Sequence, residues 1–174
     1  MNAVAVMRTN IERTFHKDEI IVTKTDLKGH ITYANQVFLR VAGYTEKEIL
    51  GQPHNIIRHP DMPRCVFKLL WDTIEAKREI FAYVLNLAKN GDHYWVFAHV
   101  TPTFDVNGNT VGYHSTRRLP KPASVAAIEP VYRMLLEEES RHSTKQEGMQ
   151  ASTALLLDTL QAKKLEYDEF VFAI

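Results

Sequence analysis

The 174-residue sequence contains only one cysteine, Cys65, which excludes an internal disulfide and fits a reducing compartment. No apolar run approaches the roughly 20 residues that a membrane helix needs, and the first ten residues lack the pattern of a signal peptide. Lys plus Arg and Asp plus Glu both count 21, so the basic excess of a general nucleic-acid binder is missing. We therefore expect a cytoplasmic protein that binds no nucleic acid and does not insert directly into a membrane.

Strand-like runs and turn signals share the stretch that holds six of the seven glycines, Gly29 to Gly112. Three helical segments, Gln36–Val41, one that follows Thr45 and one from Pro63 to about Ala76, separate the second and third strands. The predicted strands are Glu19–Thr25, His30–Ala34, Phe81–Ala88, His93–Thr101 and Thr110–Leu119. This order predicts an α+β fold, a five-stranded antiparallel sheet with helices on one face.

The run Pro120-Lys121-Pro122 breaks the chain, and no strand is predicted beyond it. Two segments there are predicted to be helical, Ser124–Ser140 and Ser152–Leu165, with the polar link Arg141–Gln150 between them. Acidic residues outnumber basic ones after residue 123, whereas the reverse holds before it. These shifts predict three parts: an N-terminal cap segment (1–18), a sheet domain (19–120) and a C-terminal helical extension (123–174).

A cluster of positive charge, Arg58, His59 and Arg64, lies beside a predicted helix start. Such a setting suits a phosphate or another anion. Prolines on both sides fix the backbone, which favours a shaped site. The alternative is a solvated polar loop.

Several longer runs carry a family resemblance. Lys24–Asn35, Gly51–Pro63 and Lys89–Val96 resemble the PAS domain of bacterial aerotaxis receptors, and the run HNIIRHPDMP that ends at Pro63 is the most specific of them. The resemblance covers about residues 19–135. It implies a PAS sensor domain at 19–120 that holds FAD non-covalently and reports redox, oxygen or energy status to chemotaxis.

The resemblance also implies which residues contact the flavin. Asp61 has an alternative role as the N-cap of the helix after Pro63, Trp71 as a core residue, and Asn86 as a solvent-facing residue. The family usually has a Trp where this chain has Ile80 and a basic Lys-Asn-Arg-Arg run where this chain has Leu85-Asn86-Leu87-Ala88, so that only Asn86 of this run matches the family. The candidate cofactor-binding residues are Asn35, Arg58, His59, Asp61, Trp71, Asn86 and Arg117.

Other chemistries are less consistent with the sequence. A LOV photoreceptor needs a reactive cysteine where this chain has Pro53-His54-Asn55, and Cys65 is expected to pack. No nucleophile–base set, zinc spacing or phosphate-binding glycine loop is present, so we expect no enzyme and no metal. A haem-binding gas sensor is an alternative because some PAS domains ligate haem through one histidine. The histidines considered are His54, His59, His93, His99 and His114.

Apolar surfaces predict interactions. The strand His93–Val100 is apolar on both faces, so a terminal segment or a partner must cover one of them. The extension carries an apolar stripe, which we expect to dock on a chemoreceptor or another signalling protein acting in trans; folding back on the sheet and homodimer formation are alternatives. We also expect a homodimer, and a ligand-free PAS interaction module is a further alternative function. The stripe consists of Val125, Ile128, Val131, Met134 and Leu135.

Overall fold

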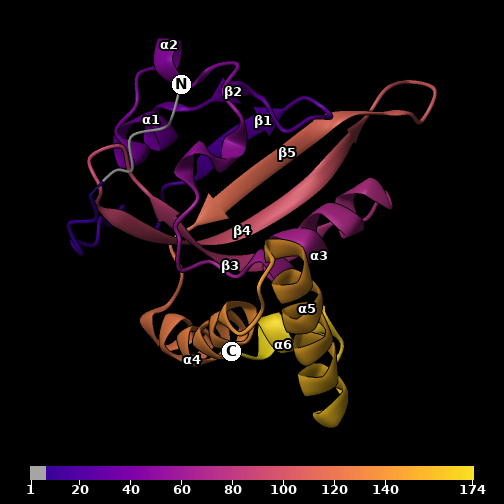
Figure 1. Ribbon diagram of the computed structural model, residues 1–174. Helices are drawn as coiled ribbons and strands as arrows, with labels where there is room; N and C mark the ends of the chain where they lie inside the picture. The colour runs from indigo at the N-terminus through magenta and orange to yellow at the C-terminus, as the bar shows by residue number, and fades with distance from the viewer. Residues whose placement is uncertain (1–6) are drawn as a thin grey trace.

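The centre of the protein is a five-stranded antiparallel sheet, seen in a computed structural model that describes residues 7–174 (Figure 1). The strands follow the order β2-β1-β5-β4-β3, so the first and last segments of the sheet domain meet at the centre. Their bounds are β1 (Ile21–Thr25), β2 (Ile31–Ala34), β3 (Ile80–Leu87), β4 (His93–Phe104) and β5 (Thr110–Arg118). The predicted fold class is confirmed.

The connection from β2 to β3 holds the helices of one face. These are α1 (Gln36–Ala42), α2 (Glu46–Ile49), the 3₁₀ helix η1 (His54–Ile57) and α3 (Arg64–Glu75). The Asn35 side chain accepts the N–H of Phe38 at the start of α1, and Gly43 ends that helix at φ 76°. The short helices α1 and α2 contact β1 and β2, respectively, and α3 is the long helix of this face.

The extension forms three helices, α4 (Pro122–Ser140), α5 (Lys145–Ala162) and α6 (Tyr167–Ala173). The prediction placed the start of α5 seven residues too late, since Thr144 and Glu147 form a capping box inside the supposed polar link. It also extended this helix to Leu165 and missed α6. A short helix of seven residues depends on tertiary packing, which local pattern does not reveal.

Helices α4 and α6 cover the outer face of β3 and β4 (Figure 1). The Trp95 ring stacks on Tyr132 of α4 with centroids 6.2 Å apart, and Phe97 meets Phe172 of α6 at 6.0 Å. The Tyr132 hydroxyl donates to the Tyr83 carbonyl oxygen at 2.6 Å. The apolar outer face of β4 is therefore covered by a terminal segment of the same chain.

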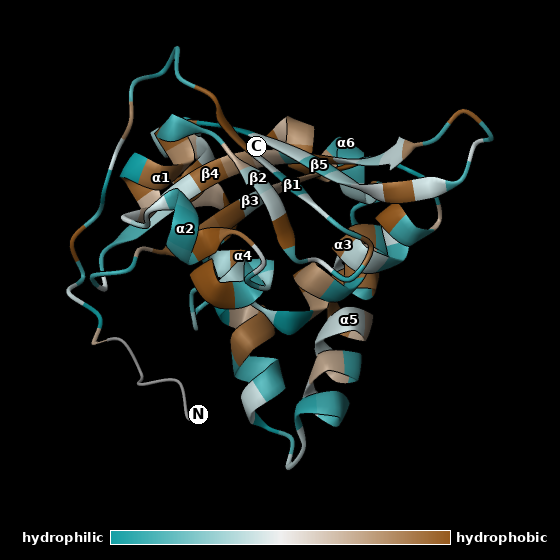
Figure 2. Ribbon diagram, turned by 90° about the horizontal axis from the view of Figure 1, so that it is seen from above, coloured by the Kyte–Doolittle hydropathy of each residue, from teal (hydrophilic) through white to brown (hydrophobic). Residues whose placement is uncertain are grey.

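This arrangement corrects the expectation that the apolar stripe of the extension is a docking surface. Ile128 and Leu135 are buried in the main core, together with Leu156 and Leu160 of α5. Figure 2 shows the hydrophilic connection between α4 and α5 at the end farthest from the sheet. The stripe folds back on the sheet because that face would otherwise expose aromatic side chains to water.

The segment before β1 runs along the turn between β3 and β4. Thr9 donates its N–H to the Gly91 carbonyl at 3.0 Å, and Arg13 donates to that of His93 at 2.7 Å. The Arg13 guanidinium also pairs with Asp92 at 2.8 Å. No helix in residues 7–174 has both the length and the apolar character to cross a membrane.

Candidate functional site

A cavity of about 550 Å³ lies between α3, the η1 segment and the inner face of the sheet. Alternate residues of the strands face it, as the two-residue period of a strand requires. The strand residues that line it are Thr23, Thr25, Val84, Asn86, Ala98, Val100, Tyr113, Ser115 and Arg117. Trp71, Phe67, Leu70 and Ile74 supply the apolar wall from α3. This volume and this mixture of apolar walls with a few polar groups are typical of a small-molecule site.

Three buried polar atoms on the sheet side of this cavity lack a hydrogen-bond partner. They are Nδ2 of Asn86, Oγ of Ser115 and Nη1 of Arg117. The hydroxyl of Tyr94 is a fourth such atom but does not line the cavity. An unpaired buried polar group costs roughly 1–3 kcal/mol. Three of them converging on one hollow indicate a ligand with several hydrogen-bonding atoms on one edge.

Arg117 is a buried cation, only 4% exposed. Its Nη2 donates to Thr23 Oγ1 and to His54 Nε2, both at 2.7 Å. Its guanidinium also lies 5.9 Å from the Phe38 ring centroid. Burial lowers the pKa of Arg117 to about 10, which still leaves it charged at neutral pH. It forms no ion pair with a carboxylate of residues 7–174, so its charge is available for an electron-rich ligand atom.

His54 is held neutral by the same environment. Burial first, and then the charge of Arg117, lowers the pKa of His54 to about 3. Its Nε2 must therefore accept a hydrogen bond from Arg117, and Thr23 Oγ1 lies 3.2 Å from the same nitrogen. No other histidine of residues 7–174 lines the cavity. Because the Nε2 of His54 is already engaged, this arrangement does not favour haem ligation.

The mouth of the cavity is rich in basic side chains. Arg58 lies 4.6 Å from the Phe67 ring centroid and donates to the Met62 carbonyl oxygen at 3.1 Å. Burial, followed by the nearby charge of Arg64, lowers the pKa of Arg58. Arg64 and two lysines, Lys28 and Lys68, also line the cavity. Two acidic residues, Asp72, which pairs with Lys68, and Glu75 at the far end of α3, line the cavity as well.

Four of the seven predicted residues meet at this cavity, namely Arg58, Trp71, Asn86 and Arg117. Arg58 and Asn86 are linked directly by an antiparallel β-bridge. Trp71 packs edge-on against Tyr113 with centroids 5.5 Å apart. Two strands (β3 and β5), helix α3 and the end of η1 therefore bring together side chains that are up to 59 positions apart in sequence.

The other three predicted residues, Asn35, His59 and Asp61, do not line the cavity. Asn35 ties β1 to α1, since its Oδ1 accepts the N–H groups of Val22 and Phe38. His59 is 5% exposed, and its Nδ1 accepts the Asp61 N–H at 3.1 Å. Their contacts support the backbone around the cavity.

Asp61 is exposed and pairs with Arg8 of the N-terminal segment at 2.9 Å. The alternative expectation that Asp61 caps the helix after Pro63 is wrong. Glu139 of α4 accepts the N–H groups of Arg64 and Cys65 instead, at 2.5 and 3.3 Å. No local pattern contains this cap, because Glu139 lies 75 positions after Arg64.

Sequence reasoning missed several cavity residues, among them Thr23, Ser115 and Met149, and considered His54 only as a haem ligand. The alternation that places Arg117 inward also places Ser115 inward, so a strand period was an available signal for it. His54 belongs to the recognised motif, but its contact with Arg117 at the cavity does not follow from sequence. Met149 lies on α5 and reaches the cavity only through the packing of the extension.

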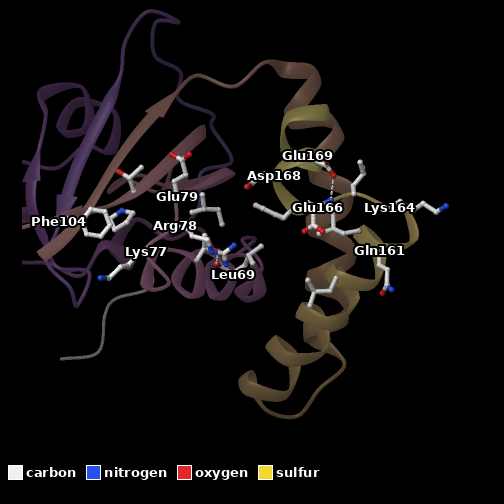
Figure 3. A pocket seen from close by; sticks show the side chains of 18 residues that line it. Leu69, Lys77, Arg78, Glu79, Phe104, Gln161, Lys164, Glu166, Asp168 and Glu169 are labelled. Atoms are coloured by element: carbon white, nitrogen blue, oxygen red, sulfur yellow. Dashed lines mark hydrogen bonds between the residues drawn. The ribbon is translucent and has the colours of Figure 1, made fainter. Parts of the chain in front are cut away.

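A second, larger hollow of about 1340 Å³ lies between the sheet domain and helices α5 and α6. Figure 3 shows Lys77, Arg78 and Glu79 on one side of it and residues of α5, α6 and their connection on the other. Charged side chains of both signs line it, and none of the unpartnered buried atoms of residues 7–174 does. The smaller cavity is therefore the candidate ligand site.

Comparisons with known proteins agree with this geometry. A family profile described as the PAS fold matches residues 31–117. The chain belongs to the PAS family. This PAS chain is 43% identical over 118 residues to the aerotaxis receptor of Escherichia coli strain K12, a match that covers 68% of this chain and 23% of the receptor. The resemblance to the aerotaxis-receptor type is confirmed.

Solved structures show the same fold. The dark structure of the LOV domain of the blue-light photoreceptor Aureochrome1 has a TM-score of 0.57 at 24% identity, and the match covers 66% of this chain and 85% of that one. A structure titled as a study of a flavin analogue in a light-oxygen-voltage domain has a TM-score of 0.56 at 22% identity, covering 71% and 87%. These likenesses show that the chain shares the fold of PAS and LOV domains.

Proposed function

We propose that this PAS domain binds FAD non-covalently and senses redox, oxygen or energy status. The observation that carries the proposal is the set of unpartnered buried donors, Asn86, Ser115 and Arg117, on the sheet wall of the cavity. The polar edge of a flavin ring presents carbonyl oxygens and ring nitrogens that suit amide, hydroxyl and guanidinium groups. Similarity to an aerotaxis receptor and to LOV domains supports a flavin as the ligand.

Each part of the site has a role in this proposal. Trp71 and Phe67 would pack against the ring, and Arg58 and Arg64 would bind the phosphates. When bound, a flavin accepts electrons and becomes more negative. The buried charge of Arg117 favours that negative form, and the Asn86 amide can rotate to exchange its donor and acceptor.

The departures from the family pattern lie outside the cavity. Ile80 is 2% exposed and packs with Ile74, Val100 and Tyr113, and it does not itself line the cavity. In the run Leu85–Ala88, only Asn86 lines the cavity. The groups that would hold the flavin ring are therefore still present, although the usual Trp and basic residues are missing at these positions. This supports retention of the cofactor.

The decisive experiment is an absorption spectrum of the purified protein, followed by release and chromatography of the pigment. We expect flavin bands and FAD in the released fraction. Asn86→Leu should lower flavin occupancy at least tenfold, while the exposed control Asn107→Leu should not change it. A haem Soret band would replace the proposal with a gas sensor, and a colourless protein that binds no added flavin would favour a ligand-free interaction module.

Illumination separates this proposal from a LOV photoreceptor. Cys65 is buried at the start of α3 and does not line the cavity, and burial raises the pKa of its thiol. A low thiolate fraction disfavours adduct formation. We expect no reversible bleaching of the flavin in light; bleaching that disappears in Cys65→Ala would refute the proposal of a light-independent sensor.

We further propose that the domain acts without catalysis, in the cytoplasm, on a chemoreceptor or a related signalling protein in trans, and as a homodimer. Relatives named as receptors support a signalling partner. Size-exclusion chromatography with light scattering tests the dimer, and cross-linking to a co-expressed chemoreceptor tests the partner. A monomer that does not cross-link under either redox state would refute both.

A further inference from the structure

Glu139, in the last turn of α4, is a buried carboxylate that joins three helices. Its side chain is 3% exposed. It accepts the backbone N–H groups of Arg64 and Cys65 at the start of α3, and the Ser152 hydroxyl of α5 donates to it at 3.1 Å. The first N–H groups of a helix have no partner within it and carry partial positive charge, so a carboxylate there is strongly held. Glu139 therefore fastens the helical extension to α3.

The same carboxylate binds a cavity residue. Oε2 of Glu139 accepts from Nη1 of Arg64 at 2.9 Å, and Arg64 also lines the mouth of the cavity beside Arg58. Met149 of α5 reaches the same cavity. Close packing of α4 and α5 makes the connection stiff, since a Cβ on Gly148 would lie 2.5 Å from the Glu139 carbonyl oxygen. The cavity and the extension thus share one guanidinium.

We propose that the phosphate groups of the ligand compete with Glu139 for Arg64, so that occupation of the cavity loosens α4 and α5 from α3. This rests on the proposed function, because it requires a phosphate-bearing ligand at the basic mouth. A phosphate near Arg58 and Arg64 both attracts the Arg64 guanidinium and repels the Glu139 carboxylate. The extension is the element that changes its docking.

Thermodynamic linkage gives the proposal a sharp test. If the ligand weakens the contact of Glu139 with Arg64, that contact must weaken the ligand by the same factor. Glu139→Gln keeps an oxygen for the Arg64 and Cys65 N–H groups but removes the charge. Glu139→Gln should therefore bind FAD at least fivefold more tightly than wild type does. Riboflavin has no phosphate, so its affinity for Glu139→Gln should equal its affinity for wild type within twofold.

Glu138→Gln is the matched control, because Glu138 lies next in sequence and pairs instead with Arg141 and His142. Both flavins should bind this variant as they bind wild type. Hydrogen exchange gives a second readout that does not depend on affinity. FAD, but not riboflavin, should speed amide exchange at the end of α4 and the start of α5 in wild type, and ligand-free Glu139→Gln should show faster exchange there than Glu138→Gln.

The failures are distinguishable. A wild-type protein that binds no flavin refutes the proposed function and this coupling with it. If wild type binds FAD, two results for Glu139→Gln refute the coupling alone. One is an FAD affinity that is unchanged or weaker than that of wild type, and the other is an affinity that improves equally for FAD and riboflavin. FAD that slows exchange in α4 and α5 also refutes it, since the phosphates would then strengthen the docking.

Discussion

Replacing Arg117 by Met should have opposite effects on stability and on ligand binding. Arg117 is a buried cation whose neutral partners are Thr23, His54 and the Phe38 ring. Replacement of buried charged groups by apolar side chains is often neutral or stabilises a protein by about 1–4 kcal/mol. Thr23 and His54 remain within hydrogen-bond distance of each other, at 3.2 Å, after the guanidinium is removed.

The ligand-free Arg117→Met protein should therefore gain about 1 kcal/mol of stability, which raises the Tm by roughly 2–4 °C for a domain of this size. Flavin binding should weaken about 10- to 100-fold, because a hydrogen bond from a charged donor contributes about 1.5–3 kcal/mol. Binding sites often reduce the stability of the ligand-free protein, because they hold polar groups that have no hydrogen-bond partner until the ligand binds.

Thermal unfolding of ligand-free protein and a fluorescence titration with FAD measure the two effects. Arg118→Met is the control, because Arg118 is the exposed neighbour on β5 and should change neither quantity. A lower Tm in Arg117→Met together with unchanged flavin affinity would refute the reasoning. That result would mean that Thr23 and His54 fully satisfy Arg117 and that it serves the core.

Two further predictions concern stability alone. Since the pKa of His54 is lowered to about 3 while the unfolded chain titrates near 6.5, its contribution is complete above pH 6.5 and is lost as the pH falls toward 3, by about 2 kcal/mol between pH 6.5 and 5. Urea unfolding should show this loss in wild type and a flatter profile in His54→Gln; equal slopes would contradict the neutral assignment of His54. Gly148→Ala should destabilise the protein by about 1–3 kcal/mol, since its Cβ meets the backbone of α4, and denaturant unfolding should show a smaller loss in Gly51→Ala, whose Cβ has no neighbour within 4 Å. Equal losses of stability in the two glycine variants would contradict the prediction. They would mean that α4 and α5 separate easily enough to accept the Gly148 methyl group, and that backbone strain at Gly51 costs as much.

Local patterns in the sequence determine much of the sheet domain. The capping residues Asn35 and Thr45, the glycines at the turns and the two-residue period of the strands act over a few positions, so the sequence reveals them. The same two-residue period places Asn86 of β3 and Arg117 of β5 on the strand faces that line the cavity. The motif around Arg58 identifies one end of the site.

Tertiary structure alone decided which charges are buried and which helices cover which face. Arg117 and His54 are 63 positions apart, and only the meeting of β1, β5 and η1 places them together without a carboxylate. The apolar stripe around Ile128 looks the same in sequence whether it binds a partner or its own sheet. The cap on α3 comes from Glu139, because the unpaired N–H groups at the start of a helix donate to any carboxylate that packing brings near, however distant it is in the chain.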